Sequence, residues 1–398
     1  MGQQGAGPAF AVSAQRPATE RAPAGTAAKT RDLRLDFFRG LSLMVIFLNH
    51  GPDGTVSWIS NRRIGFCDAA ELFVFASGCA AGIVYCRLAA RGQWLHATLR
   101  LLHRVWQIYV GHMFLFIVLT AAVALTVNSF GTQSYIKDMA ALQIVTDSEV
   151  SLIQALLLKF QPTLLDILPL FVVIQLLFLP FIVPMVRAPW AVLGGSLALY
   201  LGAWQWGWQL PAYPPGSAWF FNPLCWQFLY VLGIFCTSHP QILAQLRRYE
   251  RLIVPAAAAY VAFAFVVAQG WNFPEFRALL PRFLQISFDL EAKIDMHPAR
   301  LLHFLAEAYL VLHFLRPDAK WLRHPLAQPM IYCGRLPLQV FCLSVMLAFG
   351  VYVADTELHL GNVAYIAINI AGLAAMAGLG YLAHFYRQLA GRAGLTAA

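Results

Sequence analysis

Charged residues are scarce in this sequence. Asp, Glu, Lys and Arg make up only 12% of its 398 residues, while 59% of the residues are hydrophobic. An ordinary soluble domain carries about 25% charged residues. This shortage excludes an ordinary soluble protein, and apolar runs recur along the whole length. The sequence therefore predicts an integral membrane protein.

Other patterns are also missing. No extended alternation of polar and apolar residues occurs, which favours membrane helices over barrel strands. The seven cysteines mostly fall within apolar runs and form no C-x-x-C pair, so we expect neither disulfides nor a bound metal. No internal repeat signals an inverted-repeat transporter. The net charge of +9 does not indicate nucleic-acid binding, because no basic soluble domain is present.

The N-terminal segment lacks the apolar core of a signal peptide. Residues 1–30 are rich in Ala, Gly, Pro, Gln and Thr, which predicts a disordered cytoplasmic tail. Residues 31–390 contain no stretch long enough to fold as a soluble domain. We therefore expect one polytopic transmembrane domain over 31–390.

Ten apolar stretches approach the roughly 20 residues that a membrane helix needs. They are 37–53, 69–86, 105–126, 165–186, 190–208, 222–237, 252–269, 299–315, 335–354 and 362–384. Most Lys and Arg residues fall on one side if the N-terminus is cytoplasmic, which predicts that both termini are cytoplasmic. The expected fold is an all-α membrane protein of about ten transmembrane helices, with the loops 127–164 and 270–298 as caps over a cavity.

The first apolar stretch carries Arg39 near one end and His50 at the other. Eleven residues of α-helix make about three turns and span about 16 Å, so both side chains share one face. A cation and a titratable base at opposite ends of a groove suit a long molecule with an anionic head. Alternatively, Arg39 is an interfacial anchor, paired with Asp36, and His50 only ends the helix.

The pattern R-x10-H resembles the first-helix motif of the acyltransferase-3 superfamily. The segment RDLRLDFFRGLSLMVIFLNHGP around it is similar to the start of the OpgC family, proposed succinyltransferases of osmoregulated periplasmic glucans. Further similar blocks follow in order up to about residue 384. They are DAAELFVFASG (68–78), QPTLLDILPLF (161–171), LPAYPPGSAWFFNPLCWQFLYVLG (210–233), KIDMHPARLLHFLAEAYLV (293–311) and CGRLPLQVFC (333–342).

The resemblance implies a membrane O-acyltransferase of the bacterial inner membrane. It would move an acyl group, succinyl by analogy, from cytoplasmic acyl-CoA to hydroxyls of a periplasmic glucan. Acyl-CoA would be a donor substrate, with no permanently bound cofactor, and the other partners would be the glucan and membrane lipids, without nucleic acid. Whether the protein forms a homo-oligomer is left open by the sequence. The alternatives are a glycan or acyl-carrier transporter or flippase, and an O-acyltransferase for another envelope acceptor.

The expected catalytic residues are His50, Asp68 and Glu71. Imidazole titrates near neutral pH and is suited to take a proton from a hydroxyl. Direct transfer and a covalent acyl-histidine both stay open. Asp68 or Glu71 would orient the imidazole, although D-A-A-E before an apolar run is also typical of a capping box.

The expected donor site uses Arg39, Arg100, Arg104 and Arg335. Arg100 and Arg104 stand four residues apart on one predicted helix face, a spacing that suits a phosphate clamp. A positive-inside cluster is the alternative. A single tunnel would then connect these cations to His50.

The expected acceptor site uses Tyr213, Trp219, Phe220, Asn222 and Asp166. Aromatic faces pack on sugar rings and amides bond hydroxyls, although an interfacial aromatic belt also explains many of these residues, and Asp166 also suits a helix cap. Two polar residues, His112 and Glu307, lie inside predicted spans and are functional candidates by that position. His112 alternatively bonds a helix carbonyl. Glu307 is expected to have His303 or an Arg as its partner.

Overall fold

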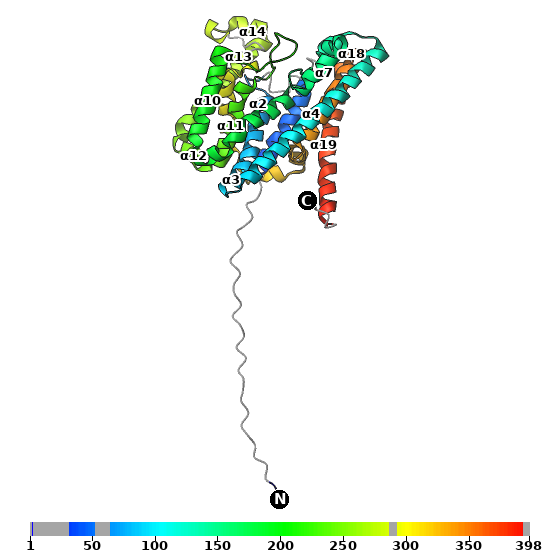
Figure 1. Cartoon of the computed structure of the whole chain (residues 1–398). Coiled ribbons are helices and arrows are strands. Elements are labelled where there is room, and N and C mark those ends of the chain that lie inside the picture. The colour runs from blue at the N-terminus through cyan, green and yellow to red at the C-terminus, as the bar shows by residue number, and fades with distance from the viewer. Residues whose placement is uncertain (1, 3–31, 52–63, 286–292, 393–398) are drawn as a thin grey trace. The chain divides into compact units, whose positions relative to one another are not determined.

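The computed structural model describes residues 2, 32–51, 64–285 and 293–392. From Leu33 onward the chain forms one compact unit (Figure 1). The regular elements among the described residues are helices, as expected. The predicted tail, 1–30, lies outside the described residues except for Gly2.

The helices follow one another with mostly short connections. The first part of the chain contains α1 (Leu33–Asn49), α2 (Ala69–Ala81), η3 (Gly82–Cys86), α3 (Arg87–Ala90), α4 (Trp94–Phe130), α5 (Ser134–Asp138), α6 (Leu142–Thr146), α7 (Ser148–Leu156), α8 (Ile167–Phe178), η4 (Leu179–Phe181), α9 (Ile182–Arg187), α10 (Pro189–Trp206) and α11 (Pro223–Ser238). The second part contains α12 (Pro240–Leu246), η5 (Arg247–Tyr249), α13 (Glu250–Asn272), α14 (Pro274–Leu279), η6 (Arg282–Leu284), α16 (Pro298–Phe314), η7 (Lys320–Arg323), η8 (Pro325–Ala327), α17 (Gln328–Gly334), α18 (Pro337–Leu358) and α19 (Asn362–Arg392).

All ten predicted stretches coincide largely with helices. Among the described residues, 6 helices are long and apolar enough to cross a membrane. They are Ala69–Ala90, Trp94–Phe130, Ile167–Arg187, Pro240–Asn272, Pro337–Leu358 and Asn362–Ala390. The chain is therefore an all-helical membrane protein.

Proline and glycine mark several helix ends. α10 begins at Pro189 and ends before Gly207, whose φ of 64° is left-handed. Proline fits the first turn because its missing N–H needs no partner there, and glycine reaches positive φ without steric cost. Asn222 caps α11 by accepting a hydrogen bond from the Leu224 N–H, and Pro223 follows it.

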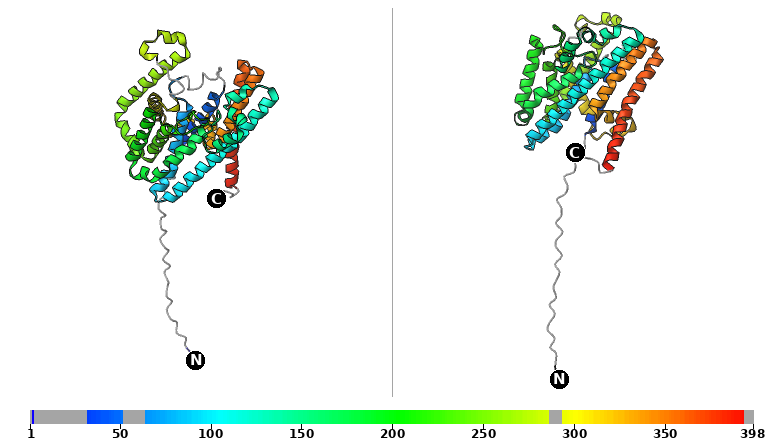
Figure 2. Two further views of the ribbon diagram at one scale, coloured as in Figure 1. Left: turned by 45° about the horizontal axis from the view of Figure 1, so that its top comes forward. Right: turned by 45° about the vertical axis from the view of Figure 1, so that its right-hand side comes forward.

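The helix α4 is longer than the predicted span 105–126. It has 37 residues and begins at Trp94. At about 1.5 Å per residue it exceeds the roughly 30 Å hydrocarbon core of a bilayer. The predicted apolar stretch begins only after the charged residues Arg100 and Arg104. Arginine has high helix propensity, so the helix itself extends through both residues towards the N-terminus. Figure 2 shows α4, α18 and α19 side by side.

Two helix crossings depend on glycines. A Cβ at Gly40 of α1 would overlap the Met330 carbonyl of α17, and a Cβ at Gly78 of α2 would overlap the Tyr230 carbonyl of α11. Small residues let membrane helices pack backbone to backbone. These crossings hold α1 and α2, which carry the R-x10-H and D-A-A-E motifs, against the rest of the unit.

Candidate active site

The candidate site is built around a cavity with a volume of about 630 Å³. It lies where the C-terminal end of α1 meets the N-terminal ends of α2, α8 and α16 and the segment before α11. Residues from both predicted capping loops line it, among them Gln143 and Lys293. Its polar and titratable lining includes Asn49, His50, Cys67, Asp68, Gln143, Lys159, Gln161, Thr163, Asp166, Tyr213, Ser217, Lys293 and Arg300.

His50 stands directly after the last residue of α1 and lines this cavity. Its backbone N–H donates to the Ile46 carbonyl at 3.1 Å, which continues the helical pattern. The buried Nδ1 atom has no hydrogen-bond partner among the described residues. In the tautomer that leaves Nδ1 unprotonated, this nitrogen is free to accept a proton.

Four charged side chains form a cluster beside His50. The Lys293 Nζ atom lies 2.6 Å from Asp68 Oδ2, and Arg300 donates from Nε to Glu71 Oε1 at 2.9 Å. The Arg300 Nη2 atom is also 3.9 Å from Asp68 Oδ2. Two acids and two bases balance each other, which allows ionised groups to remain where water is scarce.

Asp68 keeps its charge because of these neighbours. Burial by itself would raise the pKa of its carboxyl, but Lys293 and Arg300 outweigh burial and hold that pKa well below its usual range. The Ala70 N–H contributes by donating to Oδ1 at 2.8 Å. Asp68 is therefore a permanent anion in the cavity wall, and with Lys293 it acts electrostatically on the His50 ring.

The capping box that D-A-A-E suggested is present. Asp68 caps α2, and the Asp68 N–H donates to Glu71 Oε2 at 2.9 Å. Among the described residues no hydrogen bond joins either carboxylate to the His50 ring. Asp68 and His50 share the cavity, whereas Glu71 is fully buried behind it.

Aromatic residues from the α10–α11 connection form one wall of the cavity. Tyr213, Trp219 and Phe220 line it, and the Trp219 ring is fixed by an Nε1–H bond to the Pro211 carbonyl at 3.1 Å. The Lys293 Nζ atom lies 5.4 Å from the Phe220 ring centre, within cation–π range. Asp166 lines the same cavity and occupies the N-cap position of α8 without a capping hydrogen bond.

Asn222 does not line the cavity. Its Nδ2 donates to the Trp208 carbonyl and to Asp295 Oδ1, both at 2.8 Å, while its Oδ1 caps α11. This amide ties the start of α11 to two loops. Its hydrogen-bonding groups are therefore engaged within the protein rather than presented to a sugar.

A smaller cavity of about 130 Å³ contains Arg39 and Arg104. The two residues come from α1 and α4 and face the same space, as a shared anion site requires. Arg100 is exposed on α4 and does not line this cavity. Arg335 lies 3.4 Å from Asp36 through its Nε and also stays outside it.

Phe341 of α18 lines both cavities. Its side chain is fully buried. Arg39 and Arg104 line one of these cavities and His50 lines the other, and the single tunnel expected from the sequence stays a prediction. Phe341 is the residue that they share.

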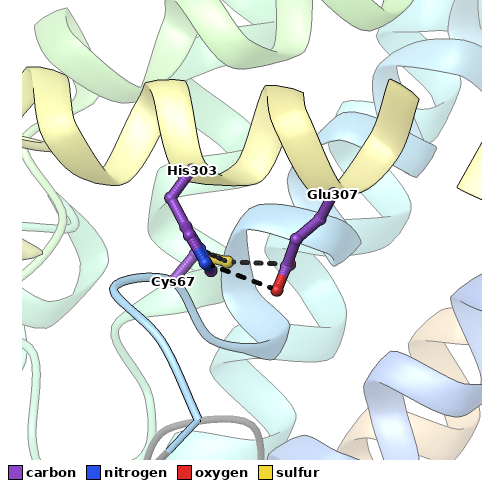
Figure 3. A group of neighbouring side chains, drawn as sticks. All are labelled: Cys67, His303 and Glu307. Atoms are coloured by element: carbon purple, nitrogen blue, oxygen red, sulfur yellow. Dashed lines mark hydrogen bonds and ion pairs between the residues drawn. The ribbon is translucent and has the colours of Figure 1, made fainter. Parts of the chain in front are cut away.

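The two polar residues predicted inside spans have different surroundings. His112 is fully buried in α4, lines neither cavity, and neither ring nitrogen has a hydrogen-bond partner among the described residues. Glu307 lies beside His303, its expected partner, with 3.7 Å between Oε1 and Nε2. Figure 3 shows that Cys67 joins them from the segment before α2.

Sequence reasoning missed three residues of the cavity wall. In the sequence Cys67 is one of several cysteines beside apolar runs, and no local pattern assigns a role to Lys293 or Arg300. Both cations belong to the block KIDMHPARLLHFLAEAYLV, where a lysine and an arginine flank the start of an apolar helix that carries Glu307. That signal indicates buried ion pairs but does not identify the acids that they meet.

Comparison with known families decides the family of this chain. The model described as OpgC protein matches residues 31–388. The chain belongs to the OpgC family. No curated protein and no solved structure matches it. Membership of the OpgC family indicates an acyltransferase-like role in glucan modification, carried out by a membrane protein.

Proposed function

We propose that this OpgC-family protein transfers an acyl group from a cytoplasmic acyl-CoA to hydroxyl groups of a periplasmic glucan. Succinyl is the acyl group that the resemblance to known sequences favours, with succinyl-CoA as donor. The protein would lie in the bacterial inner membrane with about ten spans and both termini in the cytoplasm. The acyl transfer itself would use no permanently bound cofactor.

The observation that carries this proposal is the surroundings of His50. Its buried Nδ1 has no partner among the described residues, and the ring faces a cavity of about 630 Å³ that has an aromatic wall. Such a cavity is large enough for a sugar unit of a glucan chain. A base beside a sugar-sized space is what transfer to a hydroxyl requires.

In the proposed reaction His50 takes the proton of the acceptor hydroxyl. The hydroxyl oxygen attacks the thioester carbonyl carbon, the carbon–sulfur bond breaks, and the ester and the CoA thiolate are formed. General-base assistance of this kind contributes about 10²–10⁴ in rate. Lys293 and Arg300, which line the same cavity, favour the negative charge that develops on the carbonyl oxygen.

The donor would enter from the opposite end. Arg39 and Arg104 line the smaller cavity, and two guanidinium groups suit the phosphates of CoA. The roughly 16 Å between Arg39 and His50 along α1 is a length that an extended pantetheine arm can bridge. Phe341 would then contact the arm where the two cavities meet.

The test uses purified full-length protein with a panel of acyl-CoAs and neutral glucans. Mass spectrometry would detect the ester. We expect wild type to form it and His50→Ala to lose at least about 10²-fold in rate, because the base is removed. The matched control is His96→Ala, which changes an exposed histidine of α4 that lines neither cavity.

Two results would contradict the proposal. Equal ester formation by wild type and His50→Ala would remove His50 from the chemistry. Movement of a glycan or acyl carrier across a vesicle membrane by both proteins, with no ester formed from any donor, would favour the transporter or flippase. An ester on another envelope polymer alone would change the acceptor and keep the reaction.

A further inference from the structure

Three side chains with metal-binding atoms meet next to the cluster of four charged side chains. The Cys67 Sγ atom lies 3.1 Å from His303 Nδ1 and 3.1 Å from Glu307 Oε2. His303 Nε2 is 3.7 Å from Glu307 Oε1. Figure 3 shows the three groups converging from α16 and from the segment before α2. The ligand atoms all lie within 4.8 Å of one another.

The spacing is close to that of a tetrahedral zinc site. With zinc–sulfur bonds of about 2.3 Å and zinc–nitrogen or zinc–oxygen bonds of about 2.0–2.2 Å, neighbouring ligand atoms lie about 3.4–3.6 Å apart. The Cys67 Sγ atom is 3.1 Å from an imidazole nitrogen and 3.1 Å from a carboxylate oxygen, a few tenths of an ångström below this range, and one donor atom from each of the three residues lies within 4.8 Å of the other two. Rotations of the side chains would therefore suffice to seat an ion.

The chemistry of the three ligands selects the metal. A thiolate, an imidazole and a carboxylate together suit zinc, whereas magnesium and calcium prefer oxygen ligands alone. A divalent ion with one thiolate and one carboxylate also has no net charge. In the adjoining cluster, Arg300 pairs with Glu71 and Lys293 pairs with Asp68, so these charges already neutralise each other. The zinc ion, its three protein ligands and the neighbouring ion pairs would therefore carry no net charge together.

An apolar shell surrounds the imidazole, whereas the Glu307 side chain is 35% exposed and accessible to a water ligand. The His303 side chain is only 1% exposed, and no described residue forms a hydrogen bond with its Nε2 atom. The rings of Phe66 and Tyr260 lie 5.6 Å and 6.4 Å from the imidazole. Gly65 makes room for this ring, because a Cβ there would overlap His303. An apolar shell of this kind strengthens bonds between a metal and a thiolate.

We propose that Cys67, His303 and Glu307 bind one zinc ion, with water as the fourth ligand. On binding, the Cys67 thiol releases its proton to solvent and the thiolate bonds the metal. The ion fixes α16 to the start of α2 and so holds Lys293 and Arg300 against Asp68 and Glu71. This site departs from the absence of bound metal that the cysteine pattern predicted.

The first experiment needs only the wild-type protein. Full-length protein purified in detergent through a tag without histidines would be analysed for zinc by mass spectrometry, then stripped with a chelator and titrated with cobalt. We expect one metal ion per chain. The cobalt form should have the thiolate-to-cobalt charge-transfer band in the near ultraviolet and the strong visible bands of tetrahedral cobalt.

Substitutions identify the ligands. Cys67→Ser should abolish the charge-transfer band, and His303→Gln and Glu307→Gln should each weaken metal affinity by at least about tenfold. The matched controls are Cys342→Ser and His313→Gln, which change a free cysteine of α18 and a histidine of α16 outside the trio. Both controls should bind metal like wild type.

Two outcomes would overturn the proposal. One is wild-type protein that is monodisperse yet holds no zinc and gives no cobalt bands, which would make the trio a hydrogen-bonded cluster only. The other is a Cys67→Ser protein that keeps the wild-type metal content and the charge-transfer band. Neither outcome depends on acyl transfer, so this site and the proposed reaction are tested separately.

Discussion

Oppositely charged neighbours stabilise the ionised side chains around Asp68 inside this membrane protein. Asp68 has Lys293 at 2.6 Å, and Glu71 has Arg300 at 2.9 Å from its Nε. Removing one member of such a pair leaves a buried charge without a partner, which is more costly than never having the pair. Asp68 therefore contributes to stability as well as to the charge near His50.

Replacing Asp68 with Asn tests this balance. The amide oxygen can still cap α2, so the expected loss of about 1–3 kcal/mol comes from the missing charge beside Lys293. The pKa of Asp68 is lowered from its usual 3.8 by Lys293 and Arg300, which outweigh burial. A lowered pKa gives stability that is complete above the usual value and is lost as pH falls through the folded-state value.

The difference in thermal stability between wild type and Asp68→Asn should therefore be constant between about pH 5 and pH 8, and shrink below about pH 4. Thermal unfolding in detergent across this range measures it. A difference that grows as the pH falls would mean that Asp68 is not held as an anion by its two cations.

Pairs of helices are positioned by glycines at their crossings. Gly78 of α2 meets the Tyr230 carbonyl of α11, and Gly233 of α11 meets the Phe75 carbonyl of α2. Each glycine permits the approach of the other helix, so the two positions act together. Because α2 begins directly after Asp68 and α11 begins directly after the aromatic wall, this crossing joins two elements that flank the cavity.

Gly78→Ala should separate these helices. The added Cβ would overlap backbone atoms of Tyr230, which cannot rotate away, and we expect a loss of about 1–3 kcal/mol. The control is Gly350→Ala on α18, where a Cβ meets nothing within 4 Å. That change should be neutral or stabilising by up to about 1 kcal/mol. Thermal unfolding compares both, and equal stability of the two variants would contradict the close crossing.

At the scale of the whole molecule, the proposed donor path runs through the two cavities that share Phe341. Cations line the smaller cavity, and His50 with its charged and aromatic neighbours lines the larger one. Phe341 belongs to both. In the proposed reaction the donor must extend past this ring, while water that follows it would hydrolyse the thioester.

Changing the size of residue 341 should therefore change transfer and hydrolysis in opposite ways. Phe341→Trp should lower ester formation by about tenfold or more, because the larger ring obstructs the arm and misplaces the thioester. Phe341→Ala should raise acyl-CoA hydrolysis relative to ester formation. Mass spectrometry of the ester and assay of released CoA measure the two products.

Phe349 provides the control for this test. It is a buried phenylalanine of the same helix and lines neither cavity. Phe349→Trp and Phe349→Ala should leave the ratio of ester to hydrolysis unchanged, whatever they do to stability. Normal ester formation by a stable Phe341→Trp protein would refute a donor path between the two cavities.

The sequence by itself determined the membrane class, the helical fold and the family. Apolar runs of the right length require backbone hydrogen bonds within each segment, so helices follow from composition and spacing alone. The position of Arg39 and His50 on the same face of the first helix follows from the helical period. Prolines at helix starts and the D-A-A-E capping box are local features as well, and the structure contains them.

Only the tertiary structure decided which distant residues meet. Lys293 and Asp68 are separated by 225 positions, and Cys67 and His303 by 236, so no local pattern connects them. Their contacts depend on how α16 packs beside α2, and that packing follows from the fit of whole helix surfaces. For the same reason, only the folded chain shows that the two cavities share Phe341 and that Asn222 and Arg335 line neither of them.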